Sequence, residues 1–171
     1  MEKEITIKSE RIFEGKIINL RIDTVELENQ KYAKREIVEH KGAAAILAID
    51  NDGKIVLIKQ YRKAAEDFLF EIPAGKLEID EEPIECANRE LIEETGLCPN
   101  KIDKICEFYT SPGFCDEKIY LFKATELNEV DRNLDEDEFI DIIKVTVDEA
   151  KEMVKQNKIM DAKSIVAILS L

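Results

Sequence analysis

The sequence predicts an α+β fold, or an α/β/α sandwich around a mixed sheet. Two observations predict it: short apolar strand-like runs recur along the chain, and three segments have the apolar spacing and end signals of helices. The chain has 171 residues, 44% of them hydrophobic, which is enough for one domain with a proper core. Its formal charge of −13 disfavours a nucleic acid as partner. Since no run approaches 18 apolar residues, no membrane span is expected.

The first part of the chain is expected to consist of strands. Residues 1–40 have this character throughout, and Asn51-Asp52-Gly53 supplies a turn between two apolar runs, which predicts a hairpin. Pro73, Gly75 and the acids after them are expected to form a loop. The expected strands here cover residues 16–27, 31–40, 43–50, 54–62 and 68–72.

The first helix is expected to begin near Pro83, which suits a first turn, and to end near Gly96, which suits the left-handed residue after a helix. At about 100° per residue, one arc of this helix is apolar and is expected to be buried. The residues of this arc are Ile84, Ala87 and Leu91.

Two further helices are expected near the end of the chain. Residues 146–156 open with a capping-box pattern formed by Thr146 and Glu149, and residues 161–171 open with Asp161 as the cap. Strands are expected over residues 104–110, 118–124 and 139–146, with an acidic loop over residues 128–138.

Eight carboxylates crowd into residues 75–97. Glu90 and Glu94 are four residues apart on an arc beside the expected buried face, with Glu93 flanking them. A solvated acidic face is the simpler interpretation, but acids bordering a core should repel unless a cation lies between them. Hard divalent cations take oxygen ligands, so this pattern predicts a site for Mg²⁺ or Mn²⁺. A calcium EF-hand is excluded because the acidic loop over residues 128–138 lacks the central glycine.

The cysteines and the histidine give little support to a zinc site. Four cysteines occur without a C-x-x-C pair, and His40, the one histidine, is expected to be a strand residue with no catalytic role. The chain begins with the charged stretch MEKEITIKSE, which is unlike a signal peptide. A cytoplasmic protein with reduced thiols is therefore expected.

The acidic stretch resembles the Nudix box, G-x5-E-x7-R-E-U-x-E-E-x-G-U, where U is an apolar residue. The resemblance implies an α/β/α sandwich whose mixed sheet is flanked by helices, and a hydrolase that uses a divalent metal on nucleoside diphosphates linked to another group. The fixed positions are filled by Gly75, Glu81, Arg89, Glu90, Leu91, Glu93, Glu94, Gly96 and Leu97.

A second resemblance, to ADP-ribose pyrophosphatases, narrows the substrate. Pro112, in SPGFCDE, lies fifteen residues after Leu97, and VEHKGAAAI, QYR, EIPAG and DAKSIVAI are similar to that subfamily. This implies Mg²⁺-dependent hydrolysis of ADP-ribose to AMP and ribose 5-phosphate, with Mn²⁺ able to substitute. The alternatives are a GDP- or UDP-linked sugar as substrate, or a sensor that binds a nucleotide sugar without turnover.

The resemblance also implies roles for single residues. Glu90, Glu94 and the backbone carbonyl of Ala74 would bind metal, Glu93 would help directly or through water, and Arg89 would orient the glutamates. The contacts to substrate would come from Arg62, on phosphate, from Pro112, and from Glu117, on the terminal ribose.

The catalytic base would come from the acidic loop LDEDEF, residues 134–139. Glu136 is the expected base and Glu138 a further metal ligand, although Asp135 and Asp137 are neighbours that could take these roles. The resemblance to ADP-ribose pyrophosphatases also implies that residues 1–40 form a dimerisation region and residues 41–171 the Nudix hydrolase domain. A homodimer is therefore expected.

Overall fold

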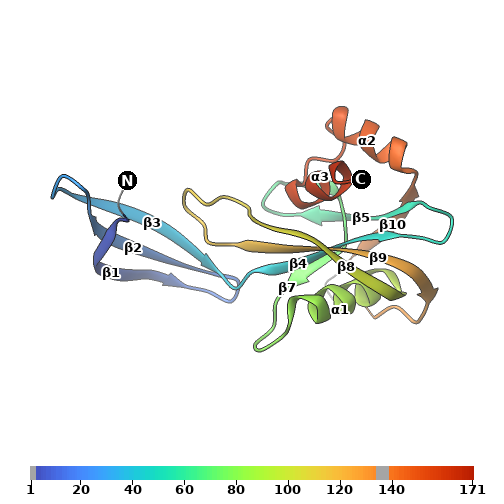
Figure 1. Ribbon diagram of the computed structural model, residues 1–171, viewed down its shortest axis with the longest axis horizontal. Helices are drawn as coiled ribbons and strands as arrows, with labels where there is room; N and C mark the ends of the chain where they lie inside the picture. Colours follow the sequence, from blue (N-terminus) through green and yellow to red (C-terminus); the bar gives the residue numbers. More distant parts are fainter. Residues whose placement is uncertain (1–2, 134–138) are drawn as a thin grey trace. The chain divides into compact units, whose positions relative to one another are not determined.

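The computed structural model describes residues 3–133 and 139–171 (Figure 1). They divide into two compact units. The first holds the chain up to Gly42 together with Phe108–Lys118, and the second holds Ala43–Glu107 and Ile119–Leu171. Glu136 and Glu138, the expected base and additional ligand, lie outside the described residues.

The first unit contains a three-stranded antiparallel sheet in the order β1-β2-β3. Its strands are β1 (Ile5–Glu14), β2 (Ile18–Glu26) and β3 (Tyr32–His40). Every residue of β1 is exposed, whereas Asp23 and Val25 of β2 are buried. The segment Phe108–Lys118 reaches β3 through a parallel bridge between Val38 and Cys115.

The second unit contains a mixed seven-stranded sheet in the order β10-β5-β4-β9-β8, with β6 paired to β5 and β7 paired to β4. It is mixed because β4 runs antiparallel to β5 and parallel to β9. The strands are β4 (Ala43–Ile49), β5 (Ile55–Arg62), β6 (Asp67–Glu71), β7 (Ala74–Lys76), β8 (Leu97–Tyr109), β9 (Lys118–Glu129) and β10 (Ile140–Val145).

Helices cover both faces of this sheet, α1 (Pro83–Thr95) on one side and α2 (Val147–Lys155) and α3 (Ala162–Leu169) on the other (Figure 1). Side chains alternate along a strand, so β4 can be buried on both faces. Ala44 and Ile46 of β4 pack in one core cluster with Leu91 of α1. The α/β/α arrangement of the α+β class is thereby confirmed.

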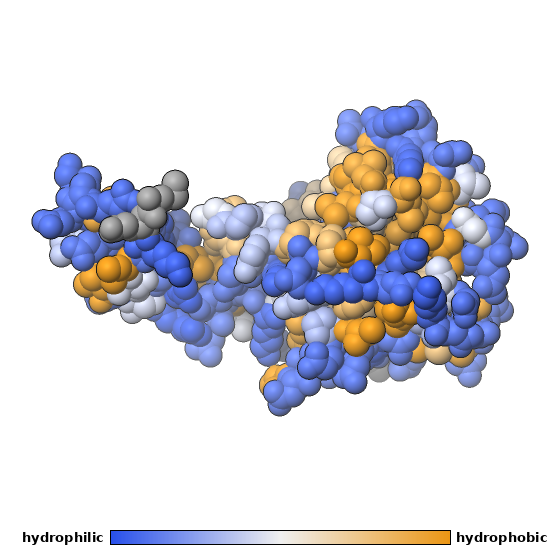
Figure 2. Space-filling view, viewed as in Figure 1, coloured by the Kyte–Doolittle hydropathy of each residue, from blue (hydrophilic) through white to orange (hydrophobic). Residues whose placement is uncertain are grey.

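The ends of the helices follow the expected chemistry. Gly96 ends α1 in the left-handed conformation, with φ of 69°, and donates its N–H to the carbonyl of Ile92 at 2.8 Å. Thr146 and Glu149 form the full capping box of α2, and the Asp161 carboxylate accepts the N–H of Ser164 at the start of α3. Leu169, at the end of α3, is 60% exposed, and Figure 2 shows hydrophobic surface in the region where Figure 1 places α3. Among the described helices, none has the length and apolar character that crossing a membrane would need.

Two expectations about the region of the box are wrong. Ala74–Lys76 forms strand β7 rather than a loop, because its backbone pairs with Ala43–Ala45 of β4. Ile84 is 45% exposed, while Ala87 and Leu91 are fully buried as expected. The buried face of α1 turns instead toward Cys86 and Glu94, since these residues pack against β4 and β7.

Candidate active site

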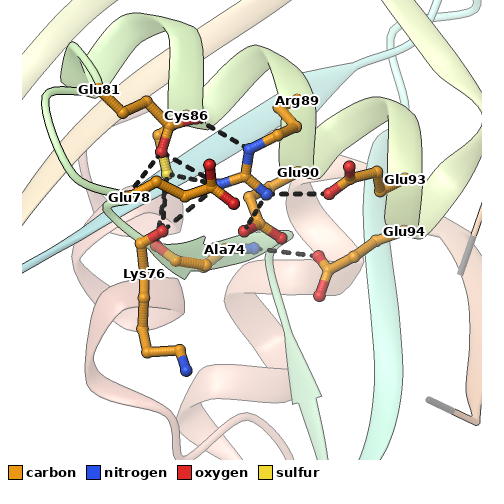
Figure 3. A network of polar contacts seen from close by, with 10 residues as sticks. Ala74, Lys76, Glu78, Glu81, Cys86, Arg89, Glu90, Glu93 and Glu94 are labelled. Atoms are coloured by element: carbon orange, nitrogen blue, oxygen red, sulfur yellow. Dashed lines mark hydrogen bonds and ion pairs between the residues drawn. The ribbon is translucent and has the colours of Figure 1, made fainter. Parts of the chain in front are cut away.

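Helix α1 carries a buried carboxylate at its C-terminal end. Glu94 is only 2% exposed, and its Oε2 accepts the backbone N–H of Ala74 at 3.0 Å (Figure 3). Ala74 begins β7, which β4 holds in place through the pair Ala45–Ala74. Strand and helix therefore fix Ala74 and Glu94, two of the expected metal ligands, beside each other.

Glu90 lies one turn earlier on α1 and packs directly against Gly75. A β-carbon added at Gly75 would lie 1.7 Å from Glu90 Oε1 and 1.9 Å from its Cδ, so only glycine leaves room for this carboxylate. Gly75 thus allows a side chain to approach the backbone closely, which is a common reason for glycine at such a position.

Arg89 draws the acids of the box together (Figure 3). Its Nε and Nη2 donate to the two oxygens of Glu81 at 2.8 and 3.1 Å, and its Nη1 donates to Glu90 Oε1 at 2.8 Å and to Glu93 Oε2 at 2.9 Å. Hydrogen bonding from Arg89 outweighs burial and lowers the pKa of Glu81. The same bond to Glu81, with the charge of Glu90, raises the pKa of Arg89. One guanidinium therefore contacts three acids of the box, the arrangement in which Arg89 could take the orienting role that the resemblance implies.

Cys86 completes the packing under this network. Its Sγ lies 3.4 Å from the carbonyl oxygen of Lys76 and 3.5 Å from Arg89 Nη2. Burial and the charge of Glu81 raise the pKa of the Cys86 thiol to about 12. The thiol is therefore uncharged at neutral pH and acts as a small packing group.

The donor set fits a hard divalent cation. Glu90, Glu93, Glu94 and the Ala74 carbonyl offer oxygen atoms only, which Mg²⁺ and Mn²⁺ favour. In the part of the chain that the structure describes, no three His, Cys, Asp or Glu side chains are already grouped as a metal cluster. Instead, Arg89 holds Glu90 and Glu93, as an internal cation between acids that would otherwise repel.

Arg62, the expected phosphate contact, forms a bidentate pair with a residue to which the sequence assigned no role. Its Nε and Nη2 donate to the two oxygens of Glu71 at 2.7 and 2.8 Å. Glu71 is 1% exposed and also forms a close ion pair with Lys163 of α3. One signal for it was present in the sequence: an acid within the apolar strand run FLFEI.

Pro112 and Glu117, the other expected substrate contacts, belong to the first unit. Glu117 Oε2 accepts the hydroxyl of Thr110 at 2.8 Å, and its Oε1 lies 3.5 Å from Nδ1 of His40. His40 ends β3, and its Nδ1 accepts the backbone N–H of Gly42 at 3.0 Å.

The mixed sheet between helices, with the glutamates of α1 held around Arg89, agrees with the class that the sequence resembles, hydrolases that act on diphosphates with a divalent metal. The chain belongs to the NUDIX domain family, whose model matches residues 39–165. Residues 4–38 match the nucleoside diphosphate sugar hydrolase N-terminal domain.

Two relatives share the name ADP-ribose pyrophosphatase. The protein from Bacillus subtilis (strain 168) is 51% identical over 168 residues, 97% of this chain and 91% of the relative. The one from Mycobacterium tuberculosis is 37% identical, over 97% of this chain and 82% of the relative. A GDP-mannose pyrophosphatase from Cronobacter sakazakii is 38% identical, over 81% and 77% of the two chains.

A solved structure described as an ADP compounds hydrolase has the same fold, with a TM-score of 0.88. It covers 99% of this chain and 92% of its own, at 19% sequence identity. At this low identity the likeness concerns the fold alone.

Proposed function

We propose that this Nudix hydrolase cleaves the diphosphate of ADP-ribose, giving AMP and ribose 5-phosphate. The observation that carries the proposal is the 51% identity, over 97% of the chain, to the ADP-ribose pyrophosphatase of Bacillus subtilis. The glutamates of α1, with Glu90 packed against Gly75 and Glu94 against Ala74, support the same chemistry. They could hold a divalent cation, which supplies the positive charge that the oxygens of a diphosphate need.

The proposed cofactor is Mg²⁺, with Mn²⁺ as a substitute, held by Glu90, Glu93, Glu94 and the carbonyl of Ala74. When bound, the cation supplies charge neutralisation for the phosphoryl oxygens and activation of water. The chain itself does the positioning: the Ala74 N–H orients the Glu94 carboxylate, and Arg89 holds its neighbouring acids.

The remaining proposed roles belong to the substrate contacts and to the base. Arg62, Pro112 and Glu117 are proposed to contact the substrate, and the planar fork of Arg62 suits phosphate oxygens. Glu136 is proposed to accept the proton of the attacking water, with Glu138 as a further metal ligand.

A panel of nucleotide sugars tests the proposal. The purified protein is incubated with Mg²⁺ and ADP-ribose, GDP-mannose or a UDP-sugar, and the products are identified by mass spectrometry. We expect kcat/KM to be highest for ADP-ribose, with AMP and ribose 5-phosphate as products. Cleavage of ADP-ribose no faster than GDP-mannose would overturn the substrate assignment.

Hydrolysis of a GDP-linked sugar is the second candidate. The GDP-mannose pyrophosphatases among the relatives favour it, because they share up to 38% identity with this chain. The box builds the metal site and not the base pocket, so only the nucleotide panel separates the two substrates.

A homodimer formed through residues 1–40 is proposed as the assembly. In its support, every residue of β1 is exposed, and its apolar side chains Ile5, Ile7 and Phe13 are 54–61% exposed. Light scattering at micromolar concentration is expected to give twice the 19.6 kDa of one chain. The proposed location is the cytoplasm, where the four free cysteines would stay reduced.

A further inference from the structure

Among the described acids of the second unit, Glu71 is the most deeply buried, with 1% of its surface exposed, and two cations from different elements hold it. It ends β6, and its two oxygens accept Nε and Nη2 of Arg62, from β5, at 2.7 and 2.8 Å. Lys163 of α3 pairs with Glu71 Oε2 and also lies 3.0 Å from Asp161 Oδ1. These two acids and two bases form one network of balanced charge.

A buried carboxylate of this kind needs both partners. Burial opposes its charge, yet the hydrogen bonds of Arg62 and the charge of Lys163 hold the pKa of Glu71 below its ordinary value. Glu71 is therefore ionised at neutral pH. Because an unpaired buried charge is strongly unfavourable, loss of either partner would destabilise the fold.

The network also reaches the segment that presents the metal ligands. Directly after Glu71, the N–H of Ile72 donates to Ser164 Oγ of α3 at 2.8 Å, and the carbonyl of Pro73 accepts the N–H of Ile46 at 2.9 Å. The next residue, Ala74, donates to Glu94. Glu71 and α3 thus anchor the start of a short segment whose end touches the box helix.

Arg62 lies within electrostatic reach of that helix. Its hydrogen bonds to Glu71 raise its pKa, and the charge of Glu94 adds to the effect. Glu71 takes two of the five N–H donors that a guanidinium carries, and a bidentate pair fixes the plane of the group. The Arg62 side chain remains 40% exposed on the same unit as the glutamates.

We propose that Glu71 is a positioning residue: its carboxylate, anchored to α3 by Lys163, sets the guanidinium of Arg62 in the orientation that receives the substrate diphosphate. The proposal rests on the proposed function, since it concerns the same site. Without the second oxygen of Glu71, Arg62 keeps its charge but loses its fixed plane. The orientation of the phosphate contact, and not the metal site, is then what changes.

A double-mutant cycle tests the proposal through KM and kcat. Glu71→Gln is expected to raise the KM for ADP-ribose about tenfold, with a smaller change in kcat, because uniform binding of the diphosphate is lost. In the Arg62→Ala background the same substitution should change KM by less than about twofold, since the residue it acts through is absent. Glu66→Gln, an exposed acid in the loop between β5 and β6, is the matched control and should leave KM unchanged.

Several results would overturn the proposal. An unchanged KM in Glu71→Gln would do so, as would an equal increase in both backgrounds, which is what a purely structural role produces. If Glu71→Gln does not fold, Glu71→Asp keeps the charge but withdraws the carboxylate, and the same two criteria apply. If the wild type prefers another nucleotide sugar, the proposed substrate is wrong. The double-mutant cycle is then measured on the preferred sugar, and the proposal for Glu71 is tested separately.

Discussion

The carboxylate of Glu90 occupies the space that a β-carbon on Gly75 would need, 1.7 Å from such an atom. Both partners belong to secondary structure, Gly75 to β7 and Glu90 to α1. Neither element can yield easily, because β7 is paired to β4 and the face of α1 is packed against the core. The position of one expected metal ligand therefore depends on the absence of a side chain at residue 75.

Gly75→Ala is expected to displace the Glu90 carboxylate and to lower Mn²⁺ affinity at least about tenfold, as shifts around metal ligands commonly do. Paramagnetic resonance of bound Mn²⁺, measured without substrate, gives the affinity directly. Gly113→Ala is the control for stability, because an added β-carbon meets nothing within 4 Å there. Unchanged Mn²⁺ affinity in Gly75→Ala would contradict the role given to Glu90.

Glu94→Gln is expected to lower kcat by about 100-fold or more and to leave the fold intact. Glutamine keeps an oxygen for the N–H of Ala74, so the helix stays in place, but the charge for the cation is lost. A loss of several kcal/mol in transition-state stabilisation corresponds to about this factor. Turnover and circular dichroism are measured together, with Glu85→Gln on the exposed side of α1 as the control. Full turnover in Glu94→Gln would refute its assignment as a ligand.

Glu81 should make the stability of the protein depend on pH. Hydrogen bonds from Arg89 lower the pKa of Glu81 in the folded protein below its ordinary value of 4.5. A lowered folded pKa adds stability that is complete above the unfolded pKa and is lost as the pH falls through the folded one. The wild type should therefore melt at a higher temperature than Glu81→Gln at neutral pH, and the difference should shrink below about pH 4.5.

Thermal melts of both proteins, from neutral pH into the acid range, measure this difference. Glu82→Gln changes an exposed neighbour whose side chain makes no capping bond, and serves as the control for removing one charge. A difference that persists undiminished in acid would show that Glu81 stabilises the fold in some way other than as a carboxylate.

Glu136→Gln is expected to lower kcat by about 10²- to 10⁴-fold, the usual contribution of a general base. Stability should not change, because the role proposed for this residue is proton transfer and not packing. Rates are measured over a range of pH. Loss of the base should remove the acidic limb of the pH–rate profile, where the rate of the wild type falls as the base becomes protonated. If activity survives in Glu136→Gln and is lost in Glu138→Gln, the two roles are exchanged.

Local chemistry made much of the fold predictable. Pro83 fixes its own φ at a value that suits a first turn, and Gly96 adopts the left-handed conformation without a steric penalty, so the bounds of α1 follow from the sequence. Thr146 and Asp161 cap their helices through contacts within three residues, which are also visible in the sequence. The spacing of the box likewise places Arg89 near Glu93, one turn away on the same helix.

Contacts between distant segments were not predictable in this way. Ile84 has the right spacing for the buried face, but the direction from which the sheet approaches α1 leaves it exposed. Ala74–Lys76 has the composition of a loop and becomes a strand only because β4 offers a partner. The partner of Glu71, Lys163, is 92 residues away, and no periodicity connects the two.

The parallel pairing of β4 with β9 has a consequence for how the chain folds. Ala43 pairs with Ile119 and Ala48 with Ala124, so each paired residue of β4 has its partner in β9 76 positions later in the sequence. Closing so long a loop slows folding, and on the ribosome β4 cannot be complete until β9 has been synthesised. Until then its uncharged run, AAAILAI, lacks this neighbour and is open to pairing with another nascent chain.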